Sequence, residues 1–231
     1  MAEVLVTGAS RGIGLAFTEH YLAGGDRVFA CCRAPAAAAR LQELAAEHPA
    51  LTVVPMDVTE PDQVDAARDL VAARCGGGLD LLINNAGILR SVASFRDVEE
   101  RDFLDSMRVN ALAPLRVIRA FEGLLRGGRR PRIVNLTAPV RPIAEIARAA
   151  QHTYLASRYA LNALTRMVAI ELADSGIVTV ALWPGYIRTD MNGHAADAEP
   201  AAEAVPKAAA VIAASTADDN GWCLLPDGTR S

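Results

Sequence analysis

The stretch that most constrains this chain is residues 4–14, where three glycines follow a short run of branched apolar residues. The apolar run predicts a buried strand that ends at Gly8, and Ile13, Phe17 and Leu22 recur at the spacing of a helix facing a core. A strand, a glycine turn and a helix N-terminus form a cradle for a nucleotide diphosphate, because glycine lets the backbone approach phosphate and the helix end offers free N–H groups. The spacing Gly-x-x-x-Gly-x-Gly differs from the commoner Gly-x-Gly-x-x-Gly, so an ordinary glycine-rich turn is the alternative.

Apolar runs and helical segments then alternate along the whole chain. Further strands are predicted at 27–32, 51–56, 79–83, 133–136 and 177–182, with a last edge strand at 221–225. Helices are predicted at 36–47, from Thr59 to about 75, at 99–126 with a break near Asn110 and Pro114, and at 151–174, and a last helix is predicted to end near 215. Thr59 is the expected cap of the second helix, with the Asp62 side chain reaching back to it. Almost wholly apolar strands between helices indicate a parallel sheet covered on both faces. We therefore expect a single α/β domain over 1–231, a doubly wound parallel sheet of the Rossmann type.

The carboxyl ends of these strands predict where a ligand binds. In a doubly wound sheet the ligand lies beyond those ends, at the point where the strand order reverses. The segments that follow the strands are 8–14, 32–33, 57–58, 84–87, 137–138 and 184–191. They are expected to line one cleft.

Composition excludes several classes of partner. Of 231 residues, 52% are hydrophobic and 22% charged, which is enough apolar material for a large core. The net charge of −4 gives no reason to expect nucleic acid or an anionic membrane as partner, and no apolar run reaches the ~20 residues of a membrane helix. No secretion signal is visible, which predicts a cytoplasmic protein. The four cysteines form no Cys-x-x-Cys and the four histidines no paired motif, so we expect structural thiols and no catalytic metal.

Six short motifs, in order along nearly the whole chain, carry a resemblance. They are Thr7–Gly14, Asp57-Val58, Asn84-Asn85-Ala86-Gly87, Asn110, Tyr154-Leu155-Ala156-Ser157-Arg158 and Pro184-Gly185. Together they resemble the short-chain dehydrogenase/reductase family. Arg188-Thr189-Asp190-Met191 and the ending Pro226-Asp227-Gly228-Thr229 look most like the carbonyl-reductase-like branch that includes sniffer and C-factor.

The resemblance implies a dinucleotide cofactor and the residues that hold it. The three turn glycines would surround the pyrophosphate, Asp57 and Val58 would contact adenine, and Ile187 and Thr189 would hold the carboxamide side. A simple strand-end turn is the alternative role for Asp57. The full set implied is Gly8, Ser10, Arg11, Gly12, Ile13, Gly14, Arg33, Asp57, Val58, Asn84, Ala86, Gly87, Tyr154, Arg158, Pro184, Gly185, Ile187 and Thr189.

The end of the second strand favours NADP(H) over NAD(H). An NAD site usually places a carboxylate there for the ribose 2′-hydroxyl, whereas a 2′-phosphate needs cations. This chain has Cys32-Arg33 at that position and Arg11 in the glycine turn, and a guanidinium fork suits a phosphate monoester. Exposed arginines without a specific role are the alternative.

The catalytic motif departs from the family pattern at two positions. A family reductase uses Ser, Tyr and Lys, supported by Asn, here Asn110. Tyr154 is present, and Arg158 stands at the Lys position on the same helix face, where it keeps the charge but cannot relay a proton. Ala138 stands at the Ser position. The neighbouring Thr137 has a hydroxyl, but it points the other way if the strand persists, unless the loop after Pro139 re-aims it.

Two hypotheses follow. In the first, the chain is an NADPH-dependent reductase of a ketone or imine with Tyr154 as acid, Arg158 in place of Lys, and Thr137, His152 or a substrate group in place of Ser. In the second, redox activity is lost and the fold serves as a binding or signalling protein, or as a non-redox catalyst of cyclisation or elimination. A lone surface histidine is the alternative for His152. Residues 191–206 are expected to form a substrate lid, and the two long helices to pair copies into a homodimer or homotetramer.

Overall fold

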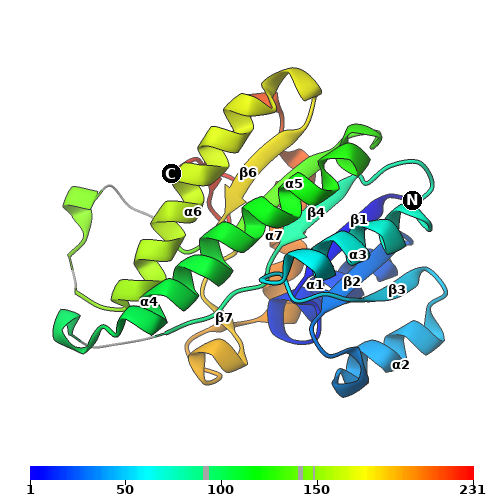
Figure 1. Ribbon diagram of the computed structural model, residues 1–231. Helices are drawn as coiled ribbons and strands as arrows, with labels where there is room; N and C mark the ends of the chain where they lie inside the picture. Colours follow the sequence, from blue (N-terminus) through cyan, green and yellow to red (C-terminus); the bar gives the residue numbers. More distant parts are fainter. Residues whose placement is uncertain (91–93, 140–142, 148) are drawn as a thin grey trace.

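The computed structural model describes residues 1–90, 94–139, 143–147 and 149–231. Strands and helices alternate through it (Figure 1). The strands are β1 (Glu3–Thr7), β2 (Arg27–Cys32), β3 (Leu51–Pro55), β4 (Leu81–Asn84), β5 (Arg132–Leu136), β6 (Val178–Leu182), β7 (Ile187–Arg188), β8 (Glu199–Pro200) and β9 (Cys223–Leu224). The helices are α1 (Gly12–Ala23), α2 (Ala39–Glu47), α3 (Pro61–Ala72), α4 (Glu100–Met107), α5 (Ala113–Arg126), α6 (His152–Glu171) and α7 (Ala201–Ala214).

Seven of the strands form one parallel sheet. Its order is β3-β2-β1-β4-β5-β6-β9. The order in which strands are added therefore reverses between the neighbouring, parallel β1 and β4. β7 and β8 form a separate parallel pair. The predicted Rossmann-type doubly wound sheet, including its last edge strand, is confirmed.

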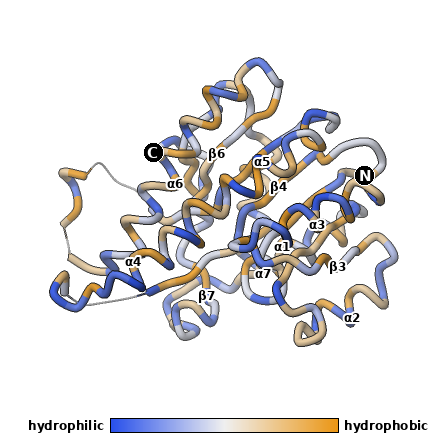
Figure 2. The backbone as a smooth tube through the Cα atoms, viewed as in Figure 1, coloured by the Kyte–Doolittle hydropathy of each residue, from blue (hydrophilic) through white to orange (hydrophobic). Residues whose placement is uncertain are grey.

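Two apolar cores cover the two faces of the sheet. Val4, Val6 and Leu182 point to one face, where α1, α2 and α7 pack. Leu5, Leu82 and Ile133 point to the other, where α3 and α5 pack. Successive strand residues alternate between the cores because side chains of a strand point to opposite faces. Hydrophobic and hydrophilic residues alternate along the helices, as expected for helices with one buried face (Figure 2).

The break predicted in the long helical segment is present. α4 ends at Met107, a π-helical turn covers Arg108–Leu112, and α5 begins at Ala113. Such a turn inserts an extra residue into the helix and often marks a functional position. Here it turns the buried Asn110 inward.

Three predicted boundaries were wrong. Thr59 does not cap α3: Glu60 is the cap residue and Pro61 the first helical residue, because the Thr59 hydroxyl is held by Asp57. α2 begins at Ala39, after a short 3₁₀ turn over Pro35–Ala37. The polar segment 191–206 is irregular only in its first part, because α7 begins at Ala201.

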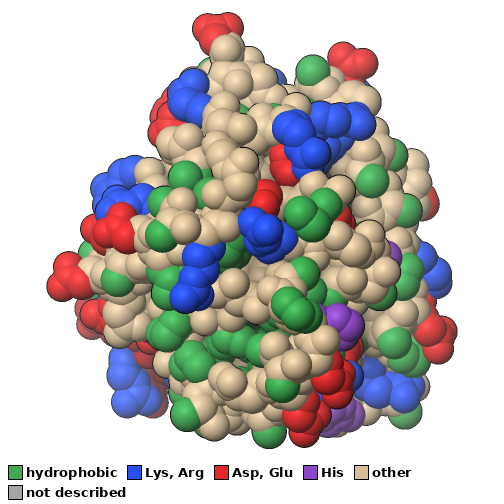
Figure 3. Space-filling model, turned by 90° about the vertical axis from the view of Figure 1, so that its right-hand side faces the viewer, with side chains coloured by type: hydrophobic (Ala, Val, Ile, Leu, Met, Phe, Trp, Pro, Cys, Tyr) green, Lys and Arg blue, Asp and Glu red, His purple; other side chains and the backbone are tan. Residues whose placement is uncertain are grey.

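The surface is of mixed charge where it can be seen. On the face drawn in Figure 3, basic and acidic side chains are interspersed rather than gathered by sign. None of the helices in the described part of the chain is both long and apolar enough to cross a lipid bilayer.

Candidate active site

The glycine turn links β1 to α1 at the carboxyl edge of the sheet. Gly8 and Gly12 have φ of +66° and +57°, a left-handed conformation that side chains beyond glycine rarely adopt. Gly14 is required for a different reason: a Cβ there would lie 2.5 Å from Asn85 Nδ2 and closer still to the Gly8 carbonyl oxygen. Conformation thus requires two of the glycines and close packing requires the third.

Asn85 and Thr7 fasten this turn to the end of β4. The Asn85 Nδ2 donates to the carbonyl oxygens of Thr7 at 2.7 Å and Gly8 at 3.1 Å. The Thr7 hydroxyl oxygen accepts from the backbone N–H groups of Asn85 and Ala86, both at 3.0 Å. Neither Thr7 nor Asn85 was in the predicted site set. A threonine and an asparagine at two adjacent strand ends were the signal in the sequence.

The predicted adenine loop is held from two sides. Asp57 Oδ1 accepts from the backbone N–H and the hydroxyl of Thr59, at 2.9 and 2.8 Å. The carbonyl oxygen of the buried Val58 accepts from Arg116 of α5 at 2.9 Å. Asp57 therefore forms the strand-end turn that was its alternative role, and that turn shapes the loop where adenine was predicted.

Tyr154 and Arg158 share one face of α6, as their four-residue spacing predicted. The Arg158 guanidinium carbon lies 5.0 Å from the centre of the Tyr154 ring, within cation–π range. Arg158 is buried, its Nη1 donates to the Leu136 carbonyl oxygen at 3.1 Å, and its Nε has no partner among the described residues. A Cβ at Gly87 would lie 2.5 Å from Arg158 Nη2, so that glycine leaves room for the guanidinium.

Asn110 ties the turn before α5 to α6. Its Oδ1 accepts from the Ile88 N–H at 2.9 Å, and its Nδ2 donates to the Ile88 carbonyl oxygen at 2.9 Å and to the Ser157 hydroxyl at 3.0 Å. Ser157 in turn donates to the Tyr154 carbonyl oxygen at 2.6 Å. Asn110 therefore positions the start of α6, and Ser157, which sequence reasoning missed, is the link.

The Thr137 hydroxyl, predicted as one substitute for the missing serine, is held by α6. The backbone N–H of Thr137 continues the strand ladder to the Leu182 carbonyl oxygen at 2.9 Å, and its hydroxyl donates to Asn162 Oδ1 at 2.7 Å. Asn135 points the same way, to Thr165 of α6 and to Asn84 of β4. That Thr137 takes part in catalysis stays a prediction. Residues 140–142 of the loop after Pro139 lie outside the described residues.

His152 is the first residue of α6 and lies two positions before Tyr154. Gln151, just before it, has a left-handed backbone with φ of 52° and ψ of 42°. The His152 Nδ1 is buried without a partner among the described residues. Burying a ring nitrogen without a hydrogen bond is costly, so this atom stands out at the start of α6.

The segment after β6 meets the glycine turn. Thr189 caps the short turn Asp190–Asn192, and its Cγ2 lies 3.3 Å from where a Gly12 Cβ would be. Arg11, predicted to bind a 2′-phosphate, has its Nη1 3.0 Å from Asp190 Oδ2, and the His194 Nε2 is 2.7 Å from the other oxygen of Asp190. The Arg11–Asp190 pair is well exposed, so it is weak and open to exchange.

The remaining predicted residues lie at the same edge. Ile13 follows Gly12 in α1, Arg33 is exposed just beyond β2, and Ser10 lies in the turn itself. Pro184 and Gly185, the latter with φ of +100°, follow β6, and the buried Ile187 begins β7. The strand ends thus bring the predicted set together along one edge of the sheet.

Two of the cysteines, Cys31 and Cys223, are buried thiols. Burial raises the pKa of the Cys223 thiol to about 11 and that of the fully buried Cys31 well above its usual value. A thiol that stays protonated is a poor nucleophile and metal ligand. Within the described residues no three His, Cys, Asp or Glu side chains gather as metal ligands would.

The sequence matches the family model described as short chain dehydrogenase over residues 2–200. The chain belongs to the short-chain dehydrogenase family. An uncharacterized oxidoreductase of Schizosaccharomyces pombe is 30% identical over 191 residues, which are 82% of this chain and 75% of that protein. This family member is thus an oxidoreductase of the short-chain type, as predicted.

Two solved structures are similar over the whole chain. The NADPH-bound carbonyl reductase from chicken fatty liver has a TM-score of 0.94 at 35% identity, covering 100% of this chain and 98% of that one. Carbonyl reductase Sniffer of D. melanogaster has a TM-score of 0.93 at 27% identity, with the same coverage. The predicted resemblance to sniffer-like carbonyl reductases is confirmed, and the NADPH of the chicken protein agrees with the predicted preference for NADP(H).

Proposed function

We propose that this short-chain dehydrogenase is an NADPH-dependent reductase of a ketone or imine in a small molecule, with an atypical active site. The carrying observation is Arg158, which lies 5.0 Å from the Tyr154 ring with a buried Nε that has no partner among the described residues. A guanidinium in the family's Lys position keeps the positive charge beside the phenol. Its free N–H suits a hydroxyl oxygen of a ribose.

The turn residues fit the pyrophosphate of a dinucleotide. Gly8 and Gly12 adopt left-handed conformations, and the space beside Gly14 is closed to any side chain. The backbone N–H groups at the start of α1 can therefore face a phosphate without a side chain between them. Arg11 lies in the same turn, and it can exchange its exposed ion pair with Asp190 for a pair with a 2′-phosphate. The exposed Arg33 is the second cation proposed to bind that phosphate. When bound, NADPH supplies the hydride.

The protein's own residues then handle the proton. Tyr154 donates its phenolic proton to the carbonyl oxygen or imine nitrogen of the substrate, and Arg158 stabilises the phenolate that remains. Ala138 offers no donor to the developing oxyanion, and the Thr137 hydroxyl is held by Asn162. His152, whose Nδ1 has no partner among the described residues, is the group proposed to take that place. An imine needs the missing donor less, because its nitrogen receives the proton directly.

Three further features belong to the proposal. Residues 191–206 act as the substrate lid, with 201–206 as its helical base. Copies pair into a homodimer or homotetramer through the long helices, where Leu112, Met167 and Ile170 are at least half exposed. The cytoplasmic location stays a prediction.

The test is cofactor titration followed by turnover. NADPH fluorescence is expected to change at a lower concentration than NADH fluorescence, and Arg11→Ala is expected to reduce that preference. A panel of ketones and imines should then oxidise NADPH in the wild type and not in Tyr154→Phe. Tyr159→Phe, on the same helix but on another face, is the matched control. Binding of NADPH without turnover on any ketone or imine would favour the second hypothesis, a binding protein or non-redox catalyst on a degenerate fold.

A further inference from the structure

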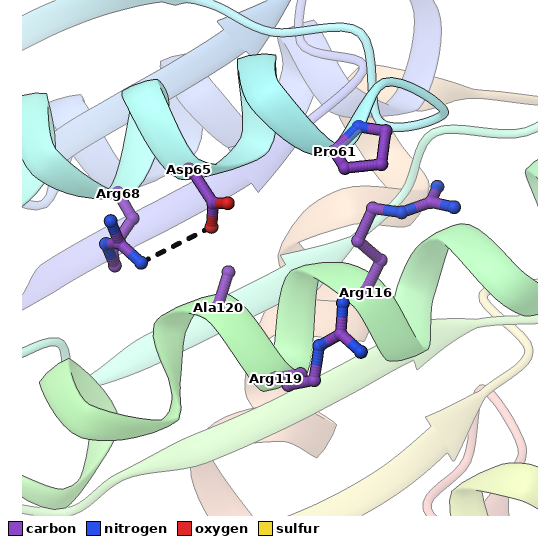
Figure 4. Close-up of a pocket in the computed structure, with 6 residues that line it drawn as sticks. All are labelled: Pro61, Asp65, Arg68, Arg116, Arg119 and Ala120. Carbon is purple, nitrogen blue, oxygen red and sulfur yellow. Dashed lines mark hydrogen bonds and ion pairs between the residues drawn. The ribbon is translucent and has the colours of Figure 1, made fainter.

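A cavity of about 240 Å³ lies between α3 and α5 and adjoins the predicted adenine loop through Arg116, which holds Val58. Pro61, Asp65 and Arg68 line it from α3, and Arg116, Arg119 and Ala120 line it from α5 (Figure 4). Three arginines and one carboxylate give the lining an excess of positive charge.

Arg68 is neutralised within its own helix. Its Nη1 lies 3.3 Å from Asp65 Oδ1 and its Nη2 lies 2.7 Å from Asp69 Oδ1. Arg68 and its two carboxylates therefore close one wall of the cavity without attracting an anion.

Arg116 and Arg119 have no carboxylate partner among the described residues. Arg116 donates Nη1 to the Val58 carbonyl oxygen at 2.9 Å, which fixes the guanidinium without neutralising it. Arg119, one turn further along α5, forms no hydrogen bond or ion pair within the described part of the chain. In Figure 4 the Arg119 side chain extends along α5 toward Arg116, below Pro61. Two guanidinium groups without a carboxylate partner among the described residues thus line the α5 side of the cavity.

We propose that this cavity binds a small phosphate-bearing anion. Planar guanidinium forks pair with phosphate oxygens through two parallel hydrogen bonds, and two of them match a dianion. The volume of about 240 Å³ equals that of about eight liquid waters at ~30 Å³ each, which admits orthophosphate or the head of a phosphate monoester. A drug-sized ligand needs ~300–1,000 Å³. Asp65 and Arg68 pair with each other on the α3 wall. The proposed anion site is therefore the α5 wall, formed by Arg116 and Arg119.

The experiment titrates the full chain with inorganic phosphate at constant ionic strength, without dinucleotide, and follows heat or phosphorus NMR line width. Saturable binding with a dissociation constant on the order of 1 mM or below is expected. A second arm uses glycerol 3-phosphate: tighter binding than orthophosphate identifies a phosphate monoester as the ligand, and equal binding identifies the free ion.

Arg119→Gln is the decisive variant and Arg126→Gln its matched control. Arg126 lies on the same helix but pairs with Glu122 at 2.7 Å, outside the cavity. Arg119→Gln is expected to weaken binding roughly tenfold, Arg119→Lys to restore part of it, and Arg126→Gln to leave it unchanged. Thermal unfolding of each variant checks that the fold is retained. Non-saturable binding, or equal loss in Arg119→Gln and Arg126→Gln, would overturn the proposal.

Discussion

The glycine turn and the end of β5 lie at the same edge of one sheet, yet they are built differently. At the turn, backbone groups face the ligand position, and Thr7 and Asn85 hold them through four hydrogen bonds. At the end of β5, the position that the family fills with a catalytic serine is the buried Ala138, whose side chain is only a methyl group. A change at the turn is therefore expected to disturb the fold, whereas Ala138→Ser after β5 is expected to alter chemistry with little effect on the fold.

The sharpest test of this difference restores the family residues at the catalytic end. The double variant Ala138→Ser, Arg158→Lys is expected to raise kcat/KM for a simple ketone roughly 10²-fold, because one donor to an oxyanion is typically worth that factor. Steady-state NADPH oxidation measures it, and the thermal midpoint should change little. Each single variant is the control for the other. An unchanged rate would mean that the absence of the serine hydroxyl and the lysine ammonium group does not limit turnover.

Gly14 provides the matching test at the cofactor end, and Gly123, a helical glycine elsewhere, is its control. Gly14→Ala places a Cβ 2.5 Å from Asn85 Nδ2 and is expected to cost about 1–3 kcal/mol of unfolding free energy, with NADPH affinity falling about tenfold or more. Gly123→Ala in α5 meets no atom within 4 Å and should stabilise the protein by about 1 kcal/mol. Denaturant unfolding and fluorescence titration measure both. Equal effects of the two substitutions would remove the claim that packing requires Gly14.

The sequence predicted the turn better than the catalytic end for a physical reason. Glycines, strand-end polar residues and apolar periodicity act locally, so the β1 turn, the sheet and the break at Asn110 could all be placed from neighbours in the chain. The partners of side chains across the sheet could not. That Arg11 pairs with Asp190 and that Thr137 is held by Asn162 depends on contacts between residues far apart in sequence.

The boundary that was wrong at α3 has a local cause. Thr59 has the right type and spacing for a helix cap, but its hydroxyl donates to Asp57, two residues earlier in the chain. By contrast, the roles of Asn85 and Ser157 depend on which elements meet. Sequence reasoning placed the elements and the cleft, and the structure assigned the hydrogen bonds within it.

The buried Asp80 lies just before β4, at the edge of the sheet opposite the candidate site. A change there is expected to alter stability without altering the site. Burial opposes ionisation of Asp80, but hydrogen bonds from the Arg129 side chain and from the backbone N–H groups of Glu3 and Arg129 outweigh it and lower the pKa of Asp80. Because the folded pKa lies below the unfolded value near 4, this stabilisation is complete above that pH and is lost as the pH falls through the folded pKa.

Asp80→Asn is therefore expected to lower the unfolding free energy by about 2 kcal/mol at pH 7, and the difference from the wild type should narrow toward pH 3. Thermal midpoints across that range measure it, and NADPH affinity at pH 7 should be unchanged. A difference that widens on acidification would contradict the lowered pKa.

The smallest expected effect concerns Thr137, and it decides how the catalytic end works. Thr137→Val removes the hydrogen bond to Asn162 while it keeps the shape, so about 1 kcal/mol of stability should be lost. If the hydroxyl is only structural, kcat/KM stays within about twofold of the wild type. Serine at the same position is the control, because it keeps the bond. A loss of rate beyond tenfold in Thr137→Val, with Thr137→Ser active, would place this hydroxyl among the reacting groups, and the oxyanion donor would then come from β5 after all.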